Sequence, residues 1–365
     1  MARRVRGLPG ATAELLLKAA LLDGDIARES WQTWHERVAF DTIDYESQLL
    51  LPLLLDNLQR LGLDDPDFPR YRGVARRIWL DNQLRKREAV GVLKLFGQAN
   101  IPVMLLKGFA LASLCYRDAR LRAALNLDIL VPVDRVGEAA GLLLAQGLHS
   151  PHAALLESPD YLATRHAATF VLPGTIGINL QWHLAPELCR PGADEEYWRD
   201  SQPMAIDGQE TRTLCRSDHL FHACIEGGRA EHAGDIGWIA DSAQILRDGD
   251  IDWQRFLSLT QQSGLALRLQ RTLGYLRESM AQPIPNRVMT QLTAMRPGRF
   301  EMLEEYAAIS SAPSLVKSAA RHYANYRRNA DRSRSFLRYL ENALGERSLG
   351  GVFLCAVRRA TQSGR

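Results

Sequence analysis

The chain has 365 residues, 46% of them hydrophobic and 24% charged, with a formal net charge of +3. This balance excludes a disordered or fibrous chain, and the length allows two or three compact units. The five cysteines are odd in number and lack CxxC spacing, which argues against a disulfide framework or zinc knuckle and favours a reducing cytoplasm. The longest leucine cluster, residues 49–55, is far shorter than the ~20 residues that cross a bilayer, so no membrane association is expected.

The first hundred residues show the spacing of amphipathic helices. Leu15, Leu16, Ala19 and Ala20 form one apolar stripe, residues 47–63 predict a second helix, and residues 71–99 predict a long third one. The segment 64–69, rich in Asp and Pro, predicts the turn between the last two. We therefore expect an N-terminal helical region over residues 1–100.

Residues 101–215 mix strand and helix patterns. Strands are predicted at 103–106, 127–131, 168–172, 176–182 and 210–214, with a hairpin turn at Pro173 and Gly174 and a helix over 134–146 closed by Gly147. From residue 216 the pattern is helical again, with Ser217 as an expected N-cap and helices at 235–246, 253–262, 265–280 and 316–344. The predicted fold class is α+β, a small mixed sheet with helices on one face, flanked by helical regions at 1–100 and 216–365.

The most informative junction is Leu105-Leu106-Lys107-Gly108, where an apolar strand turns into a helix. A glycine at such a turn lets a phosphate approach the backbone, a helix start offers unpaired N–H groups, and a lysine adds a compact charge. The chain has 40 arginines and five lysines, which gives Lys107 added weight. We expect Lys107 and Gly108 to bind triphosphate, and the alternative is a surface lysine at a strand end.

The strand predicted around residues 126–131 places Asn126 and Asp128 on the same face, because side chains alternate along a strand. Two oxygen-bearing side chains at this spacing can hold a hard divalent cation such as Mg²⁺ together with substrate phosphates and waters. Asp128 and Asn126 are therefore the predicted metal ligands.

Residues 105–108 and 126–131, with Arg122 between them, resemble the bacterial uncharacterised nucleotidyltransferase family of the polymerase-beta-like superfamily. Further matches follow in order over residues 147–148, 177–184, 218–222, 238–241 and 283–285, so the resemblance covers roughly residues 45 to 290. It implies a nucleotidyltransferase fold, a nucleoside triphosphate and Mg²⁺, with Arg122 among the cofactor-binding residues. By resemblance, Asn126 and Asp128 match the first two metal-binding carboxylates and Asn179 matches the third.

An asparagine oxygen can coordinate a cation, but it neither neutralises charge nor acts as a general base. One interpretation is a nucleotidyltransferase with a modified site that acts on an unknown small-molecule or peptide acceptor. A second is a catalytically silent nucleotide-binding or regulatory module. His183 shares the predicted strand face of Asn179, so it is a candidate base; the alternative is a polar residue on an edge strand.

A third interpretation is a helical adaptor that binds an anionic partner through its basic tail. From Lys317 to Arg365 there are eleven basic and three acidic residues. The tail lacks the regular aromatic platforms of a nucleic-acid binder, which argues against nucleic acid and favours a solvated arginine-rich helix. His219 and His222 share one helix face, but the spacing of zinc motifs is absent, and helix packing is the expected role.

Overall fold

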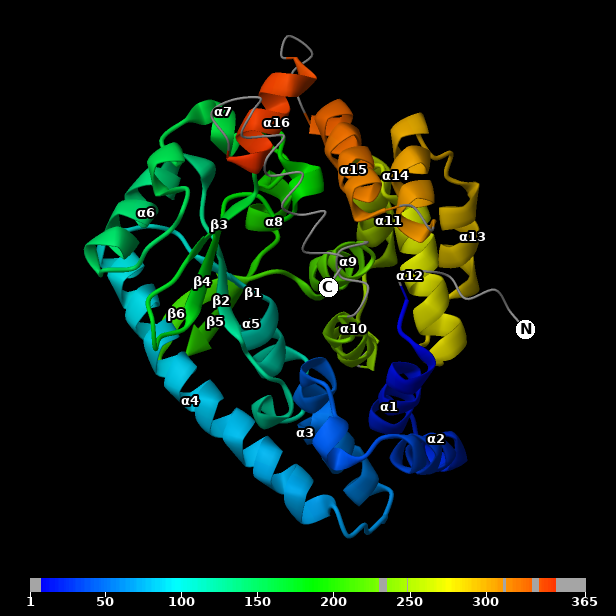
Figure 1. Ribbon diagram of the computed structural model, residues 1–365. Coiled ribbons are helices and arrows are strands. Elements are labelled where there is room, and N and C mark those ends of the chain that lie inside the picture. The colour runs from blue at the N-terminus through cyan, green and yellow to red at the C-terminus, as the bar shows by residue number, and fades with distance from the viewer. Residues whose placement is uncertain (1–7, 230–234, 248, 311–312, 330–334, 346–365) are drawn as a thin grey trace.

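The structure, a computed structural model, describes residues 8–229, 235–247, 249–310, 313–329 and 335–345. A mixed sheet lies between the long helix α4 on one side and a block of C-terminal helices on the other, and α1, α2 and α3 lie at one end of the molecule (Figure 1). This confirms the predicted α+β fold with flanking helices.

The sheet has six strands in the order β3-β4-β2-β1-β6-β5. Their bounds are β1 Met104–Leu106, β2 Asn126–Leu130, β3 Ala167–Phe170, β4 Gly177–Gln181, β5 Gln202–Ile206 and β6 Gln209–Thr213. The pairs β2–β4 and β1–β6 are parallel, and the pairs β1–β2, β3–β4 and β5–β6 are antiparallel. In this register Asp128 lies beside Leu106 on one side and Asn179 on the other.

The helices before the sheet and within it are α1 Ala11–Leu21, α2 Gly24–Arg37, α3 Tyr45–Arg60, α4 Phe68–Gln98, α5 Lys107–Leu114, α6 Val136–Ala145, α7 Pro159–Leu162 and α8 Glu195–Arg199. Those after the sheet are α9 Arg216–Gly227, α10 Gly237–Arg247, α11 Trp253–Ser263, α12 Ala266–Ser279, α13 Asn286–Ala294, α14 Arg299–Ile309, α15 Ser314–Asn329 and α16 Phe336–Leu344. Local chemistry fixes several helix ends. The Asp44 side chain accepts a hydrogen bond from Ser47 N at the start of α3, and Gly264 ends α11 in the left-handed conformation.

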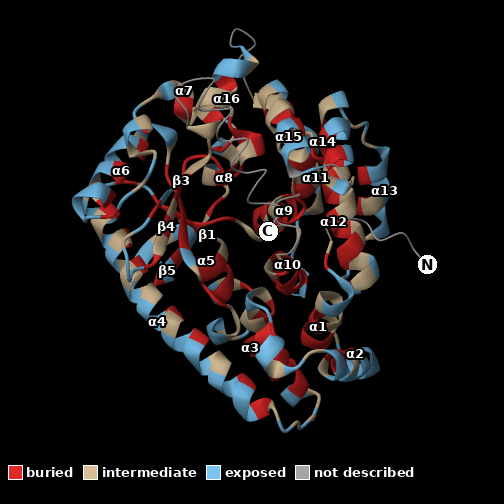
Figure 2. Ribbon diagram, in the orientation of Figure 1, coloured by how far each residue is buried: buried red, intermediate tan, exposed pale blue. Residues whose placement is uncertain are grey.

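Two hydrophobic cores hold the sheet, and the side chains of β1 alternate between them. Leu105 belongs to the core shared with α4 and α6, whereas Met104 and Leu106 belong to the core that joins α1, α3, α9, α10 and α12. Strands β1, β2 and β4 and helices α9 and α10 are mostly buried, and α4 is exposed along its outer side (Figure 2). The expectation of helices on one face was therefore too narrow, because both faces of β1 contribute to helix-packed cores.

Other differences from the sequence prediction have local causes. Strand β5 was not predicted; it is an edge strand and carries Pro203, which weakens a strand signal. Helix α9 begins at Arg216 with Cys215 as its N-cap, so Ser217 lies inside the first turn rather than at the cap. The single helix expected over 316–344 is described as α15 and α16, with residues 330–334 between them outside the described part of the chain.

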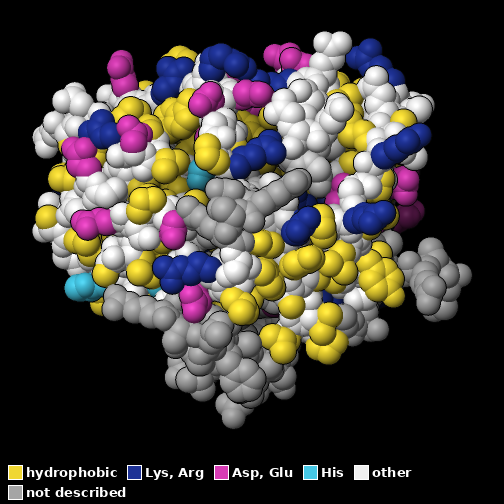
Figure 3. Space-filling view, turned by 90° about the horizontal axis from the view of Figure 1, so that it is seen from above, with side chains coloured by type: hydrophobic (Ala, Val, Ile, Leu, Met, Phe, Trp, Pro, Cys, Tyr) yellow, Lys and Arg dark blue, Asp and Glu magenta, His cyan; other side chains and the backbone are white. Residues whose placement is uncertain are grey.

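The predicted basic tail lies partly within α15 and α16, and residues 330–334 and 346–365 fall outside the described chain. Of its described arginines, Arg328 is paired with Glu304 and its side chain is only 10% exposed, whereas Arg338 pairs with Glu341 near the surface. Apolar, basic and acidic side chains are mixed on the face seen from above in Figure 3. None of the described helices combines the length and the apolar character that crossing a membrane requires.

Candidate functional site

A pocket of about 420 Å³ lies over β2, β3 and β4. Its floor includes Asp128, Asn179 and Gln181 from the sheet, and Lys107 lies at the junction of β1 and α5. Part of its wall comes from the end of the described chain, with Arg321, His322 and Asn325 from α15 and Tyr339 and Ala343 from α16. The pocket is thus built from the sheet and the C-terminal helices together.

A row of hydrogen bonds crosses three adjacent strands on the pocket floor. Thr169 Oγ1 on β3 donates to Asn179 Oδ1 on β4 at 2.9 Å, and Asn179 Nδ2 donates to Asp128 Oδ1 on β2 at 3.0 Å. Gln181, two residues along β4 on the same face, donates from Nε2 to the same Asp128 oxygen at 3.4 Å. The predicted approach of Asn179 to Asp128 is therefore what the structure shows, and the parallel register of β2 and β4 brings it about.

Lys107 also approaches this carboxylate. Its Nζ lies 3.5 Å from Asp128 Oδ1 and 2.7 Å from Glu226 Oε2, and its side chain is 30% exposed. Its backbone φ is +50°, a left-handed conformation that residues other than glycine rarely adopt. Burial by itself lowers the pKa of Lys107, but the charges of Asp128 and Glu226 outweigh it and raise that pKa above its ordinary value. The lysine is therefore a fixed positive charge on the pocket floor.

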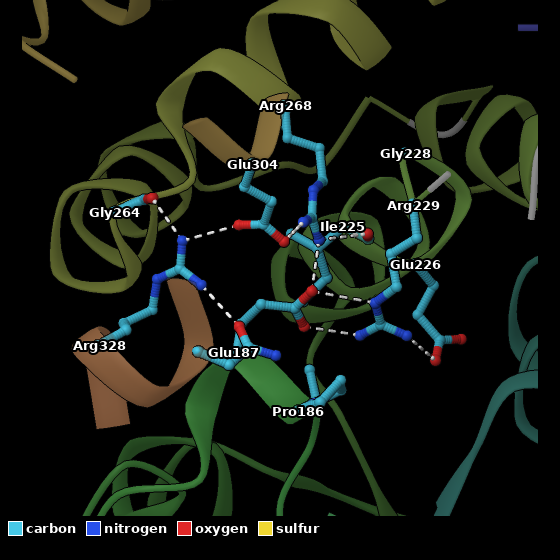
Figure 4. Close-up of polar contacts among 12 residues, drawn as sticks. Pro186, Glu187, Ile225, Glu226, Gly228, Arg229, Gly264, Arg268, Glu304 and Arg328 are labelled. Atoms are coloured by element: carbon cyan, nitrogen blue, oxygen red, sulfur yellow. Dashed lines mark hydrogen bonds and ion pairs between the residues drawn. The ribbon is translucent and has the colours of Figure 1, made fainter. Parts of the chain in front are cut away.

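Glu226, on α9, is a site residue that the sequence did not single out, because it is brought to Lys107 only by the packing of α9 against the sheet. Burial raises the pKa of Glu226, but the charges of Lys107, His222 and Arg229 outweigh burial and lower that pKa below its ordinary value, so the carboxylate is ionised. It connects the pocket to a chain of alternating buried charges. Arg229 bridges Glu226 and Glu187, Arg268 bridges Glu187 and Glu304, and Arg328 closes the series on Glu304 (Figure 4).

Gly108 and Asn126, both predicted to belong to the site, take other positions. Gly108 lies in α5, where a Cβ would come within 3.2 Å of Ala124 Cα, so its small size serves close packing. Asn126 is exposed at the start of β2, and its Oδ1 lies 2.8 Å from where a Cβ on Gly177 would stand. Neither residue lines the pocket.

His183 and Arg122 have partners outside the pocket. His183 Nδ1 lies 2.6 Å from Asp194 Oδ2, and Asp194 also accepts a hydrogen bond from Leu184 N. Strand β4 ends at Gln181, so the alternation that placed His183 beside Asn179 does not extend to it. Arg122 forms a two-pronged ion pair with Asp241 on α10, at 2.7 and 2.9 Å. The structure therefore places both side chains in contacts that connect elements of the fold.

The groups around Asp128 do not fit Mg²⁺ as they are arranged. Mg²⁺ requires about six oxygen ligands in near-octahedral geometry. Asp128 Oδ1 instead faces two amide N–H donors and the Lys107 ammonium. In the described part of the chain, the three acidic or histidine side chains close enough to share an ion are His35, Asp65 and Asp67, and none of these lines the pocket.

The histidines expected to pack within α9 do so. His219 is buried and its Nε2 lies 2.9 Å from Thr213 Oγ1, and burial lowers its pKa to about 3. His222 is also buried, with its Nε2 3.8 Å from Glu226 Oε1, and burial lowers the pKa of His222 to about 4. Both rings are neutral at physiological pH, as residues of a core are.

Comparison with known proteins points to one family. The family model described as uncharacterised nucleotidyltransferase matches residues 45–281. No curated protein matches the chain significantly. Among solved structures, an antigenic nucleotidyltransferase-like protein from Paracoccidioides brasiliensis is similar at 14% identity and a TM-score of 0.35, over 59% of this chain and 95% of that one. The pocket residues of α15 and α16 lie beyond the segment that the family model matches.

Proposed function

Because the chain belongs to the uncharacterised nucleotidyltransferase family, we propose that its pocket binds a nucleoside triphosphate without Mg²⁺-dependent transfer at Asp128. The observation that carries the proposal is the state of the Asp128 carboxylate. It is the one carboxylate that a strand contributes to the pocket lining, and it is already bonded by two amides and close to an ammonium. Such a centre retains a charged floor, but Oδ1 of its one strand carboxylate already has three partners, whereas a metal pair requires several carboxylate oxygens.

The charge of the pocket supports an anionic ligand. Its lining includes the basic side chains Lys107, Arg165, Arg229 and Arg321 against the acidic Asp128 and Glu226. An excess of basic groups in a concave, partly desolvated site raises the local concentration of a polyanion and strengthens each contact with it. Lys107 is a partly exposed residue of the pocket floor and carries three donors, so we expect it to contact phosphate.

Isothermal calorimetry with the four common ribonucleoside triphosphates, in Mg²⁺ and in EDTA, tests the proposal. We expect binding of comparable strength under both conditions and no release of pyrophosphate. The Lys107→Ala variant should bind more weakly by roughly tenfold or more, because a charge-assisted hydrogen bond contributes about 1.5–3 kcal/mol. Lys86→Ala is the matched control, since Lys86 has similar exposure but pairs with Asp207 away from the pocket. Failure of every triphosphate to bind would refute the proposal.

A second candidate is nucleotidyl transfer to an unknown small-molecule or peptide acceptor, with Mg²⁺ as cofactor. Glu226 favours it, because this second carboxylate contacts the same Lys107 ammonium as Asp128 does. If bound phosphate drew the ammonium away, the two carboxylates would be left facing the pocket. Pyrophosphate release that requires Mg²⁺ and disappears in both Asp128→Asn and Glu226→Gln would favour the transferase over the silent binder.

A further inference from the structure

We propose that the Lys107 ammonium is a built-in cation that occupies, between Asp128 and Glu226, the place where a divalent ion would otherwise bind. The inference deepens the proposed function and rests on it, because it gives the physical reason why the pocket would act without Mg²⁺. It predicts that removing the lysine creates a metal site that the natural chain lacks.

The first support is the position of the ammonium between two carboxylates from separate elements. Nζ lies 3.5 Å from Asp128 on β2 and 2.7 Å from Glu226 on α9. The two carboxylates are 9% and 16% exposed, so a positive charge between them is needed to offset their repulsion. Arg229 reaches Glu226 at 3.2 Å but is shared with Glu187, which leaves Lys107 as the charge that faces Asp128.

The second support is the backbone at Lys107. A φ of +50° is unfavourable for a side chain with a Cβ, and a glycine would adopt it without strain. The chain nevertheless carries a lysine there, directly before a glycine in the sequence. The fold therefore holds a strained residue at the position that projects an ammonium between the two carboxylates.

The third support is a buried oxygen without a partner. Gln181 is 2% exposed and lines the pocket, and its Oε1 accepts no hydrogen bond within the described residues. Its amide nitrogen donates to Asp128, so the unpaired oxygen belongs to the same cluster. A carbonyl oxygen is a ligand that hard cations accept alongside carboxylates. With the lysine removed, Asp128, Glu226 and Gln181 would offer an oxygen set suited to such an ion.

The test is binding of Mn²⁺ alone, measured by loss of the free-ion EPR signal, in the absence of nucleotide. The variants are Lys107→Met, which retains an unbranched side chain, and Lys107→Gly, which suits the positive φ and keeps the test available if the first does not fold. Lys86→Met is the control for loss of a half-exposed lysine paired with a carboxylate. Adding Asp128→Asn to each protein separates binding in the pocket from binding at His35, Asp65 and Asp67.

We expect both Lys107 variants to gain one Mn²⁺ site, at least tenfold tighter than any Asp128-dependent binding by the wild type, and to lose it when Asp128→Asn is added. Lys86→Met should behave as the wild type does. Two results would overturn the inference: Asp128-dependent Mn²⁺ binding by the wild type as tight as that of the variants, or no gain in folded Lys107→Gly. Because the Mn²⁺ measurement contains no nucleotide, its outcome can be interpreted even if no triphosphate binds, and the triphosphate titration can be interpreted even if no Mn²⁺ site appears.

Discussion

Glu187 anchors the buried charge series, and replacing it with glutamine should destabilise the protein severely. Its side chain is fully buried and accepts hydrogen bonds from Arg229 at 2.8 and 3.1 Å and from Arg268 at 2.6 Å. Burial raises its pKa, but the two guanidinium groups lower it well below the ordinary range, so the residue is an anion held between two cations. Glu187→Gln retains the shape, but it removes the charge and turns one of the two accepting oxygens into an N–H donor.

The expected cost follows from what the substitution leaves behind. Removing one partner of a buried ion pair costs about 3–5 kcal/mol, because a buried charge loses its compensation. Arg229 retains Glu226 at 3.2 Å and Arg268 retains Glu304 at 2.6 Å, so the low end of this range, about 3 kcal/mol, is appropriate. With a urea m-value of about 3 kcal/mol per molar, the midpoint should fall by about 1 M.

Urea denaturation followed by tryptophan fluorescence and by far-UV circular dichroism measures this shift. The matched control is Glu138→Gln, because Glu138 is 49% exposed and pairs with Arg135 at 2.7 Å on the surface. That control should change the free energy of unfolding by less than about 1 kcal/mol. If Glu187→Gln shifts the midpoint no more than the control does, the charge of Glu187 does not stabilise the fold.

Three further predictions concern pH, the asparagines and helix packing. Burial lowers the pKa of His222 in the folded protein to about 4, below the ordinary 6.5, so the stability that its neutral form contributes is present above pH 6.5 and is lost as the pH falls toward 4. Between pH 7 and pH 5 the loss in free energy of unfolding is about 2 kcal/mol. The melting temperature of His222→Gln should therefore depend less on pH than that of the wild type does. Asn179→Asp, beside Asp128, should raise Mg²⁺ affinity if that position once held metal, whereas Asn126→Asp, outside the pocket, should leave it unchanged; a lower melting temperature of Asn179→Asp without any gain in Mg²⁺ response would contradict that origin. Gly227→Ala should lower the urea midpoint, because a Cβ there would stand 2.0 Å from the Trp238 ring; an unchanged midpoint would mean that α9 and α10 separate without cost.

The floor of the pocket was predictable because it depends on strand geometry. Alternation placed Asp128 on one face, and a parallel neighbour brought Asn179 beside it. The turn at Lys107 was visible as an apolar run that meets a glycine. These features depend on residues close in sequence or on the fixed spacing of paired strands.

The remaining features depend on tertiary contacts that no local pattern encodes. Glu226 lies on a helix whose apolar stripe is visible in the sequence, but that stripe does not predict that the end of the helix brings Glu226 into contact with Lys107. The sequence does not show that Arg122 pairs with Asp241, because the two residues are brought together only when α10 packs in the folded protein. His183 was assigned by continuing an alternation past the end of β4, where the chain has left the extended conformation.

Helix α1 shares its core with residues that the ribosome adds much later. Leu16 and Leu17 are fully buried in the same cluster as Ile239 and Leu269, and α1 contacts α10 directly. Helices α2 and α3, made soon after α1, cover much of it, but some two hundred residues separate α1 from α10, and at about 5–20 residues per second the part of the α1 face that packs on α10 waits roughly 10–40 s for that helix to emerge. During translation this face is a natural site for a chaperone, and synthesis of the chain should be more sensitive to chaperone depletion than refolding of the finished protein in dilute solution.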